Sequence, residues 1–221
     1  MENGIPLAAE FGTVVINFSG CPGGCKADKT PNFVTCPWPD DYANAAKYQW
    51  DEVLIPYWHG LVATARDAGV GRLCLELHGQ QNVYNVATMM RLRDAVGDVV
   101  GTNFDPSHLM WMGADPMAAI RALGDAIYHV HAKDTRIDVA NAGVNSVIDT
   151  TPMDALGARS WGYVTLGFGH DLAWWREFCT VLRRTGYDDV LSIEHEDFSL
   201  TPEDGVRESV LLLNAALGRR G

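Results

Sequence analysis

Short runs of apolar residues, rich in β-branched side chains, recur along the chain. Their hydrophobicity is almost continuous, which is typical of strands that are covered on both faces in a parallel sheet. The runs cover residues 14–18, 73–77, 100–104, 127–132 and 190–195. They predict five strands of one parallel sheet.

Helical patterns fill the segments between these runs. Asp115 is placed to cap a helix that starts at Pro116 and stops at Gly124. Strand and helix therefore alternate, which predicts an α/β fold, and the length suits a single domain, residues 1–221. Further helices are expected at 40–69 (broken by Pro56), at 85–97, from Asp171 to Gly186, from Thr201 to Gly218, and before Gly12.

The spacing of polar residues at the strand ends matches one strand–helix unit, except in the last interval. Glu76 and Asp105 are 29 residues apart, and Asp105 and His131 are 26 apart. The 63 residues from His131 to Glu194 are too many for one unit. The excess predicts a loop at roughly 135–170, and long loops after strands commonly handle the substrate in α/β barrels.

Composition and charge exclude several classes of partner. The 221 residues carry a formal net charge of -11, and an acidic surface repels a phosphate backbone, so no nucleic-acid partner is expected. The sequence has no run of 18 apolar residues and no secretory-signal pattern at its start, so no membrane partner is expected either. Five scattered cysteines fit a reducing compartment, which predicts a cytoplasmic location.

Three of the cysteines lie near one another in the sequence: Cys21, Cys25 and Cys36. Three thiols are able to hold a metal ion, but a structural zinc site usually shows two tight pairs of ligands. Here there is only one loose pair, so we interpret these residues as loop cysteines.

Each of the last four strands ends in residues of metal-binding type. Charged side chains at the ends of core strands cost free energy to bury unless they are paired or bound to a cation, so four such ends predict one metal site. Carboxylates with an imidazole suit a divalent ion such as Mn²⁺, Mg²⁺ or Co²⁺, in preference to Zn²⁺. His129 and His131 point to the same side of a regular strand, so geometry does not choose between them. The strand ends offer Glu76 with His78, Asp105 with His108, His131 with Lys133, and Glu194 with Glu196.

Four motifs resemble the xylose isomerase-like TIM-barrel superfamily: "LCLELHGQQNVYN", "TNFDPSHLMWMGADP", "IYHVHAKDT" and "LSIEHED". They stand in the order of that superfamily, and the resemblance runs from near residue 10 to the end of the chain. Its members include sugar-phosphate isomerases and epimerases, hydroxypyruvate isomerase-like proteins and, distantly, endonuclease IV. The resemblance implies a (β/α) TIM-barrel fold and a sugar or polyol as the small-molecule substrate.

The resemblance also implies roles for individual residues. The ligands of the superfamily match Glu76, Asp105, His131 and Glu194, with the second histidine of "HVH" as the ligand. The histidine of the Asp-Pro-Ser-His motif faces the substrate, and so does a polar residue just after the third ligand. The substrate-binding candidates are His108, His78, Lys133 and Arg136.

The implied reaction is isomerisation or epimerisation through an enediolate intermediate. A metal ion acts as a Lewis acid on a chelated hydroxyketone, and a carboxylate removes the proton from the adjacent carbon. In the epimerases of the superfamily the two Glu ligands form the acid/base pair, which implies Glu76 and Glu194 as the catalytic residues here. The sequence does not distinguish isomerase from epimerase.

The chain departs from the superfamily in its number of strands. The family barrel has eight strands and carries its ligands on the last four, so the run at 14–18 is about the fourth strand. We therefore expect an incomplete barrel with about five of eight βα units. Truncation is the preferred explanation, and a real short protein or strands missed within 20–60 are the others. Such a sheet has exposed edge strands, which favour a homo-oligomer.

Alternatives from other classes remain open. A non-catalytic partial barrel would bind metal without exchanging a proton of any ketose. An apurinic endonuclease-like DNA-repair enzyme would need a basic groove, and no cluster of Lys or Arg provides one. An inosose dehydratase-like lyase would remove water from a polyol ketone.

Overall fold

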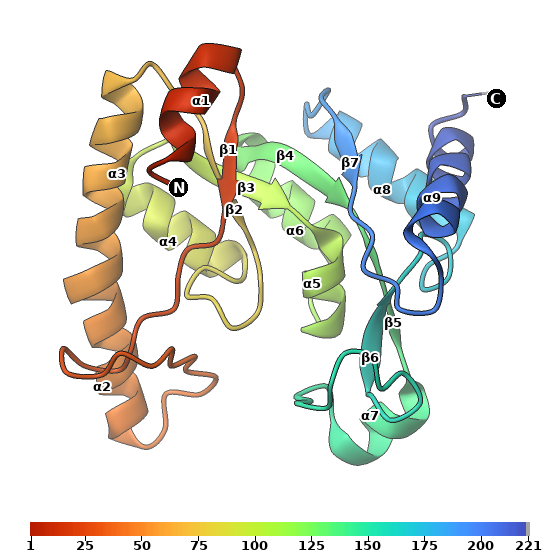
Figure 1. Ribbon diagram of the computed structural model, residues 1–221, viewed down its shortest axis with the longest axis horizontal. Helices are drawn as coiled ribbons and strands as arrows, with labels where there is room; N and C mark the ends of the chain where they lie inside the picture. Colours follow the sequence, from red (N-terminus) through yellow and green to blue (C-terminus); the bar gives the residue numbers. More distant parts are fainter. Residues whose placement is uncertain (220–221) are drawn as a thin grey trace. The chain divides into compact units, whose positions relative to one another are not determined.

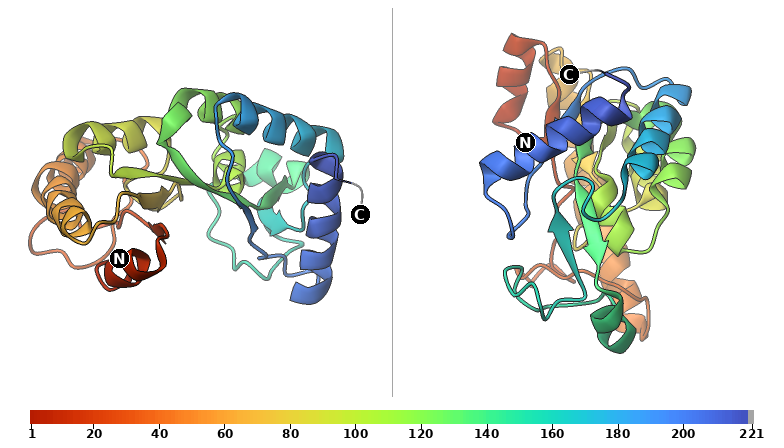
Figure 2. Two further views of the ribbon diagram at one scale, coloured as in Figure 1. Left: turned by 90° about the horizontal axis from the view of Figure 1, so that it is seen from above. Right: turned by 90° about the vertical axis from the view of Figure 1, so that its right-hand side faces the viewer.

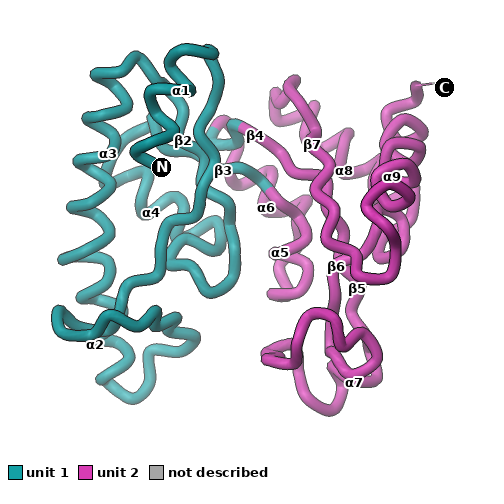
Figure 3. Tube along the Cα trace, in the orientation of Figure 1, with its two compact units in different colours: residues 1–104, 126–128 teal, residues 105–125, 129–221 magenta. Residues whose placement is uncertain are grey.

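The computed structural model of the protein describes residues 1–219 and has an α/β architecture. Five strands belong to one sheet in the order β1-β2-β3-β4-β7, and β5 pairs with β6 in a second sheet. The chain forms two compact units, shown in teal and magenta in Figure 3. Unit 1 holds residues 1–104 and 126–128, and unit 2 holds residues 105–125 and 129–221. The five predicted strands and the α/β class are confirmed.

Unit 1 contains three parallel strands: β1 (Val15–Asn17), β2 (Leu73–Glu76) and β3 (Val100–Phe104). Every residue of β2 and β3 is buried, which explains the continuous hydrophobicity of these runs. The register places Glu76 opposite Asn103 at the carboxyl end of this pair.

The helices of unit 1 follow the predicted pattern, and α3 packs against α4 (Figure 1). The helix expected over 40–69 is not interrupted at Pro56. Instead a π-helical turn, η1 (Gln49–Leu54), precedes Pro56, which sits in the first turn of α3. Proline is tolerated there because the backbone N–H groups of the first helical turn have no partner within the helix, so the N–H that proline lacks costs no hydrogen bond. The helices are α1 (Gly4–Phe11), α2 (Asp40–Tyr48), α3 (Ile55–Asp67) and α4 (Val86–Val96).

Unit 2 is built on a parallel pair of strands, β4 (Ile127–Ala132) and β7 (Leu191–Ile193), of which the first two residues of β4 belong to unit 1. Helix α8 packs against both α6 and α9 (Figure 2). The predicted caps are confirmed, since the side chains of Asp115, Asp171 and Thr201 each accept a backbone N–H at a helix start. The helical elements in the second half of the chain are α5 (Pro106–Trp111), α6 (Pro116–Leu123), η2 (Gly124–Ala126), α8 (Leu172–Arg184) and α9 (Pro202–Ala216).

Each unit has its own apolar core. Burying a large apolar side chain contributes about 1.5–3 kcal/mol, so these residues dominate the stability of their unit. The largest fully buried side chains include Trp58, Leu73, Met89 and Phe104 in unit 1, and Leu109, Ile120, Trp175 and Phe178 in unit 2. Within residues 1–219, no helix combines the length and the apolar character that a bilayer span requires.

The segment at 135–170 is not the plain loop that its spacing predicts. It contains an antiparallel hairpin of β5 (Asp134–Ile137) and β6 (Trp161–Val164), with the short helix α7 (Val139–Asn145) between them. Burial alternates along β6, as expected for a strand with one covered face. The extra residues therefore build a structured arm on unit 2.

A buried carboxylate, Asp134, fixes the turn that follows β6. Its Oδ2 accepts the backbone N–H groups of Gly167, Gly169 and His170 at 2.9–3.2 Å, and its Oδ1 lies 2.7 Å from Nδ1 of His170. The chain wraps so closely that a Cβ at Gly169 would lie 2.6 Å from Oδ1 of Asp134. The glycine is therefore required by the close approach of the Asp134 side chain.

We expect Gly169→Ala to lower the free energy of unfolding by about 1–3 kcal/mol, because the added methyl group has to displace Asp134 or the carbonyl of Thr135. Urea denaturation followed by circular dichroism measures the effect. Gly162→Ala in β6 is the control, since a Cβ there meets nothing within 4 Å. Equal stability of the two variants would contradict this account of the turn.

Burial also predicts which cysteines react. Burial raises the pKa of Cys74 to about 12 and raises the pKa of Cys179, whereas Cys25 and Cys36 are exposed. In the folded protein at pH 8, iodoacetamide should modify Cys25 and Cys36 and spare Cys74 and Cys179, as read by peptide mass spectrometry. Denatured protein, in which all the cysteines react, is the control. Modification of Cys74 at the rate of Cys25 would show that β2 opens readily.

Candidate metal centre

Asp105 occupies the junction between β3 and α5, and its side chain is fully buried. Its Oδ1 caps α5 by accepting the backbone N–H of Ser107 at 2.8 Å, and Pro106 sets the first helical turn. The cap fixes the carboxylate, so the second oxygen, Oδ2, points at a fixed set of neighbours. A buried carboxylate of this kind needs positively polarised partners.

His131 and Glu194 meet Asp105 in unit 2. His131 lies near the end of β4 and Glu194 directly follows β7, and the two strands pair up to their last residues. Nδ1 of His131 lies 3.0 Å from Oε2 of Glu194 and 3.9 Å from Oδ2 of Asp105. The ligand atoms that these three residues offer all lie within 4.8 Å of one another, which is close enough to share one ion.

The other histidine of this strand has a different partner. Nε2 of His129 lies 2.9 Å from Oγ of Ser192, and the two histidine rings are 5.7 Å apart. Burial, followed by the proximity of His131, lowers the pKa of His129, which favours its neutral form. The structure thus places His131 among the carboxylates and His129 against a hydroxyl group.

Glu76 and His78 belong to unit 1. Glu76 ends β2, is 5% exposed, and accepts a hydrogen bond of 2.9 Å from the side-chain amide of Asn103. His78 is half-buried, its Nδ1 contacts the carbonyl of Gly79, and its ring lies edge-on to Phe18 at 5.2 Å. The carboxylate of Glu76 is therefore held by a neutral donor on the neighbouring strand.

Lys133 brings the only side-chain ammonium group among the predicted site residues of unit 2, and it is almost fully buried. Its Nζ lies 2.5 Å from Oε2 of Glu196, 3.3 Å from Oε2 of Glu194 and 3.9 Å from Oδ2 of Asp105. Burial by itself would lower the pKa of Lys133, but the charges of Asp105, Glu196 and Glu194 raise it. Lys133 therefore stays charged and offsets part of the negative charge of the cluster.

The remaining predicted substrate-binding residues differ in exposure. His108 is fully buried, with its Nε2 3.4 Å from Oδ2 of Asp105 and its Nδ1 2.9 Å from the hydroxyl of Tyr163. Arg136 is exposed on β5, where it lines a cavity of about 50 Å³ together with Tyr163 and Ser199. Contact of either residue with a substrate stays a prediction.

Glu196, named from the sequence as one of the polar residues at the last strand end but not among the site residues, pairs with Lys133. One residue of this cluster was not predicted from the sequence. Tyr163 lies with its ring 4.1 Å below Nζ of Lys133. The run "WGYV", with alternating aromatic residues, is a strand signal within a segment that its spacing alone marks as a loop.

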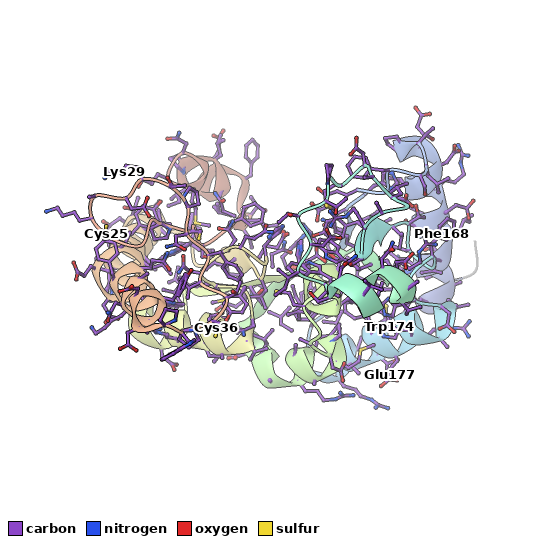
Figure 4. The ribbon with its side chains drawn as sticks, turned by 90° about the horizontal axis from the view of Figure 1, so that it is seen from below. Cys25, Lys29, Cys36, Phe168, Trp174 and Glu177 are labelled. Carbon is purple, nitrogen blue, oxygen red and sulfur yellow. The ribbon has the colours of Figure 1, made fainter. Side chains whose placement is uncertain are left out.

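The cysteines of the segment 21–36 take no part in a cluster of this kind. Within residues 1–219 they are not among the groups of His, Cys, Asp and Glu that could hold an ion. Cys25 and Cys36 lie at separate positions of the loop before α2 (Figure 4). Their interpretation as loop cysteines agrees with this placement.

Comparison with known proteins identifies the family. The family model described as "Xylose isomerase-like TIM barrel" matches residues 1–216. The chain is 46% identical over 207 residues to "Uncharacterized protein YfiH" of Bacillus subtilis (strain 168), covering 93% of this chain and 66% of that protein. The chain thus spans slightly less than two thirds of the length of this relative.

Solved structures share the fold. The 3-keto-D-glucoside 4-epimerase YcjR of E. coli superposes with a TM-score of 0.62 at 16% identity, over 97% of this chain and 68% of that chain. A xylose isomerase-like TIM barrel protein from Mycobacterium smegmatis, in complex with magnesium, superposes with a TM-score of 0.59 at 18% identity, over 97% and 66%. The five-stranded sheet with its helices is accordingly an incomplete TIM barrel. The chain belongs to the xylose isomerase-like TIM-barrel family.

Proposed function

We propose that the protein is a divalent-metal-dependent isomerase or epimerase that acts on a sugar or polyol. The observation that supports this most directly is the meeting of Asp105, His131 and Glu194 around one point, with their ligand atoms within 4.8 Å. A second line of support is that a protein of the same fold, YcjR of E. coli, is a 3-keto-D-glucoside 4-epimerase. Cytoplasmic location and homo-oligomerisation stay predictions.

Glu76 is the proposed fourth ligand. It stands opposite Asn103 in the β2–β3 register, and its carboxylate is bonded to the Asn103 side chain. Asp105 is two residues further along the chain, so its Cα lies no more than about 7.6 Å from that of Asn103. Parallel strands bring their carboxyl ends to the same edge of a sheet, which supports the assignment of Glu76 to the same centre.

The proposed donor set consists of three carboxylate oxygens and one imidazole nitrogen, and it fits a divalent cation. Oxygen-rich sets suit Mg²⁺ and Mn²⁺, and one imidazole also admits Co²⁺. Among solved structures of this fold, the M. smegmatis protein is described in complex with magnesium and the IOLI protein with a bound zinc atom, so the preference over Zn²⁺ rests on the donor set alone. When bound, such an ion supplies Lewis acidity that polarises the substrate carbonyl.

The chain's own residues would handle the protons and the substrate oxygens. Glu194, about one third exposed beside Lys133, is the proposed base for a C–H next to the carbonyl, and Glu76 is its acid/base partner. The ammonium of Lys133 is able to donate a hydrogen bond to a substrate oxygen. His78, His108 and Arg136 are the further substrate-binding candidates. Loss of this proton would give an enediolate intermediate, and its reprotonation on the same or the neighbouring carbon would give the product.

Calorimetric titration with Mn²⁺ tests the centre itself. We expect one site per chain, lost in Glu194→Gln, which replaces a charged carboxylate by a neutral amide, and in His131→Gln, which removes the imidazole nitrogen. Glu177→Gln on α8, labelled in Figure 4, is the matched control, since Glu177 is exposed and faces Arg121. His129→Gln should retain the site, because His129 bonds Ser192. Binding that survives His131→Gln and disappears in His129→Gln would reverse the assignment of the two histidines.

Proton exchange tests the reaction. With Mn²⁺ bound, incubation with a panel of ketohexoses in D₂O should place deuterium on the carbon next to the carbonyl of at least one of them, as seen by NMR. Glu194→Asp should slow the exchange at least tenfold, because it retracts the carboxylate by one methylene and loses its positioning. Mn²⁺ binding without any exchange would favour the alternative of a non-catalytic, metal-binding partial barrel.

A further inference from the structure

The His108 ring is held at both of its nitrogens, and the side chain is fully buried. Nδ1 lies 2.9 Å from the hydroxyl of Tyr163, and Nε2 lies 3.4 Å from Oδ2 of Asp105. An ionised carboxylate accepts hydrogen bonds and never donates one, so the nitrogen that faces Asp105 carries the proton in the neutral ring. The other nitrogen, Nδ1, is then an acceptor, and the phenol of Tyr163 is its donor.

This arrangement connects Tyr163 to a proposed metal ligand through the His108 ring. The Tyr163 hydroxyl hydrogen-bonds Nδ1 of His108, and Nε2 of His108 faces, at 3.4 Å, the Asp105 oxygen that also faces His131 and Lys133. Partners that orient a ligand carboxylate set its direction and basicity, and their loss typically costs ten- to a hundredfold in metal affinity.

The hairpin that carries Tyr163 is itself anchored to α5, the helix that starts after Asp105. Thr135, the register partner of Tyr163, donates its hydroxyl to the carbonyl of Ser107 at 2.9 Å. The rings of Trp161 and Trp111 stack with centroids 4.7 Å apart and planes within 1°. Two contacts on either side of Tyr163 therefore fix the hydroxyl relative to His108, and Tyr163 is only 7% exposed.

We propose that Tyr163 is a positioning residue of the metal centre, acting through His108 on Asp105. This rests on the proposed function, because Asp105 is taken as a ligand. The aromatic ring has a separate contact, since it lies 4.1 Å below Nζ of Lys133. Tyr163→Phe removes the hydroxyl and keeps this ring, so it isolates the link to His108.

A double-mutant cycle measured by Mn²⁺ calorimetry tests the proposal. Tyr163→Phe should weaken Mn²⁺ binding by about tenfold in the otherwise native chain. His108→Ala removes the side chain through which Tyr163 is proposed to act, so Tyr163→Phe added to His108→Ala should change affinity less than about twofold. Tyr187→Phe is the control for losing a tyrosine hydroxyl, because Tyr187 donates to the carbonyl of Val190.

Two results of the cycle would overturn the proposal. The first is unchanged Mn²⁺ affinity in Tyr163→Phe. The second is an equal loss in both backgrounds, which would mean that Tyr163 supports the centre by another route, such as the hairpin as a whole.

A metal-free measurement separates this proposal from the proposed function. The measurement records the ¹⁵N chemical shifts of the histidine rings, and the loss of signals in His108→Gln assigns those of His108. In the native chain, Nδ1 of His108 should have the chemical shift of an unprotonated nitrogen that accepts a hydrogen bond. In Tyr163→Phe, this chemical shift should move toward the value of an unprotonated nitrogen without a hydrogen bond. An Nδ1 signal that does not move would overturn the Tyr163–His108 link. If the native chain binds no Mn²⁺ while this signal moves, the link stands and the metal function fails.

Discussion

The buried charge of Asp105 is the constraint on which the rest of the centre depends. A fully buried carboxylate at the end of β3 is tolerated only with several positively polarised neighbours. One oxygen is satisfied by the first turn of α5, where Asp105 is the cap. The other gathers His108, His131 and Lys133 at 3.4–3.9 Å, and each of these side chains is positioned by its own strand or helix. Removing the charge would leave these nitrogen groups clustered without their common acceptor.

The hairpin arm of unit 2 explains how the nitrogen-bearing side chains around Asp105 are held in position. Lys133 links β4 to β5, and a lysine with its long flexible side chain is easily misplaced unless both ends are fixed. Glu196 fixes its ammonium group from the β7 side, and the ring of Tyr163 covers it from the hairpin. The arm is therefore as much a part of the proposed centre as the strand ends are, because its residue Tyr163 covers Lys133 and contacts His108.

The sequence predicts the part of this protein that follows from local rules. Continuous apolar runs predict buried parallel strands, and Asp115, Asp171 and Thr201 predict helix starts, because each signal acts through its immediate neighbours. Candidate ligands at strand ends could be predicted because parallel strands bring their carboxyl ends together. The β5–β6 hairpin was predicted as a loop because the spacing between His131 and Glu194 gives only the number of residues between two strand ends and not the structure that they form. The pairing of Thr135 with Tyr163 and the stacking of Trp161 on Trp111 are long-range contacts that no local pattern specifies.

The surroundings of the two proposed acid/base residues bear on the class of reaction. Glu76 is nearly buried and accepts from a neutral amide, whereas Glu194 is about one third exposed and adjoins both Lys133 and His131. Different surroundings allow two residues of the same type to act as acid and base in one turnover. Within the proposed function, removal of a proton from one face of a carbon and its return to the other face would use both carboxylates, whereas transfer to the neighbouring carbon would need only one.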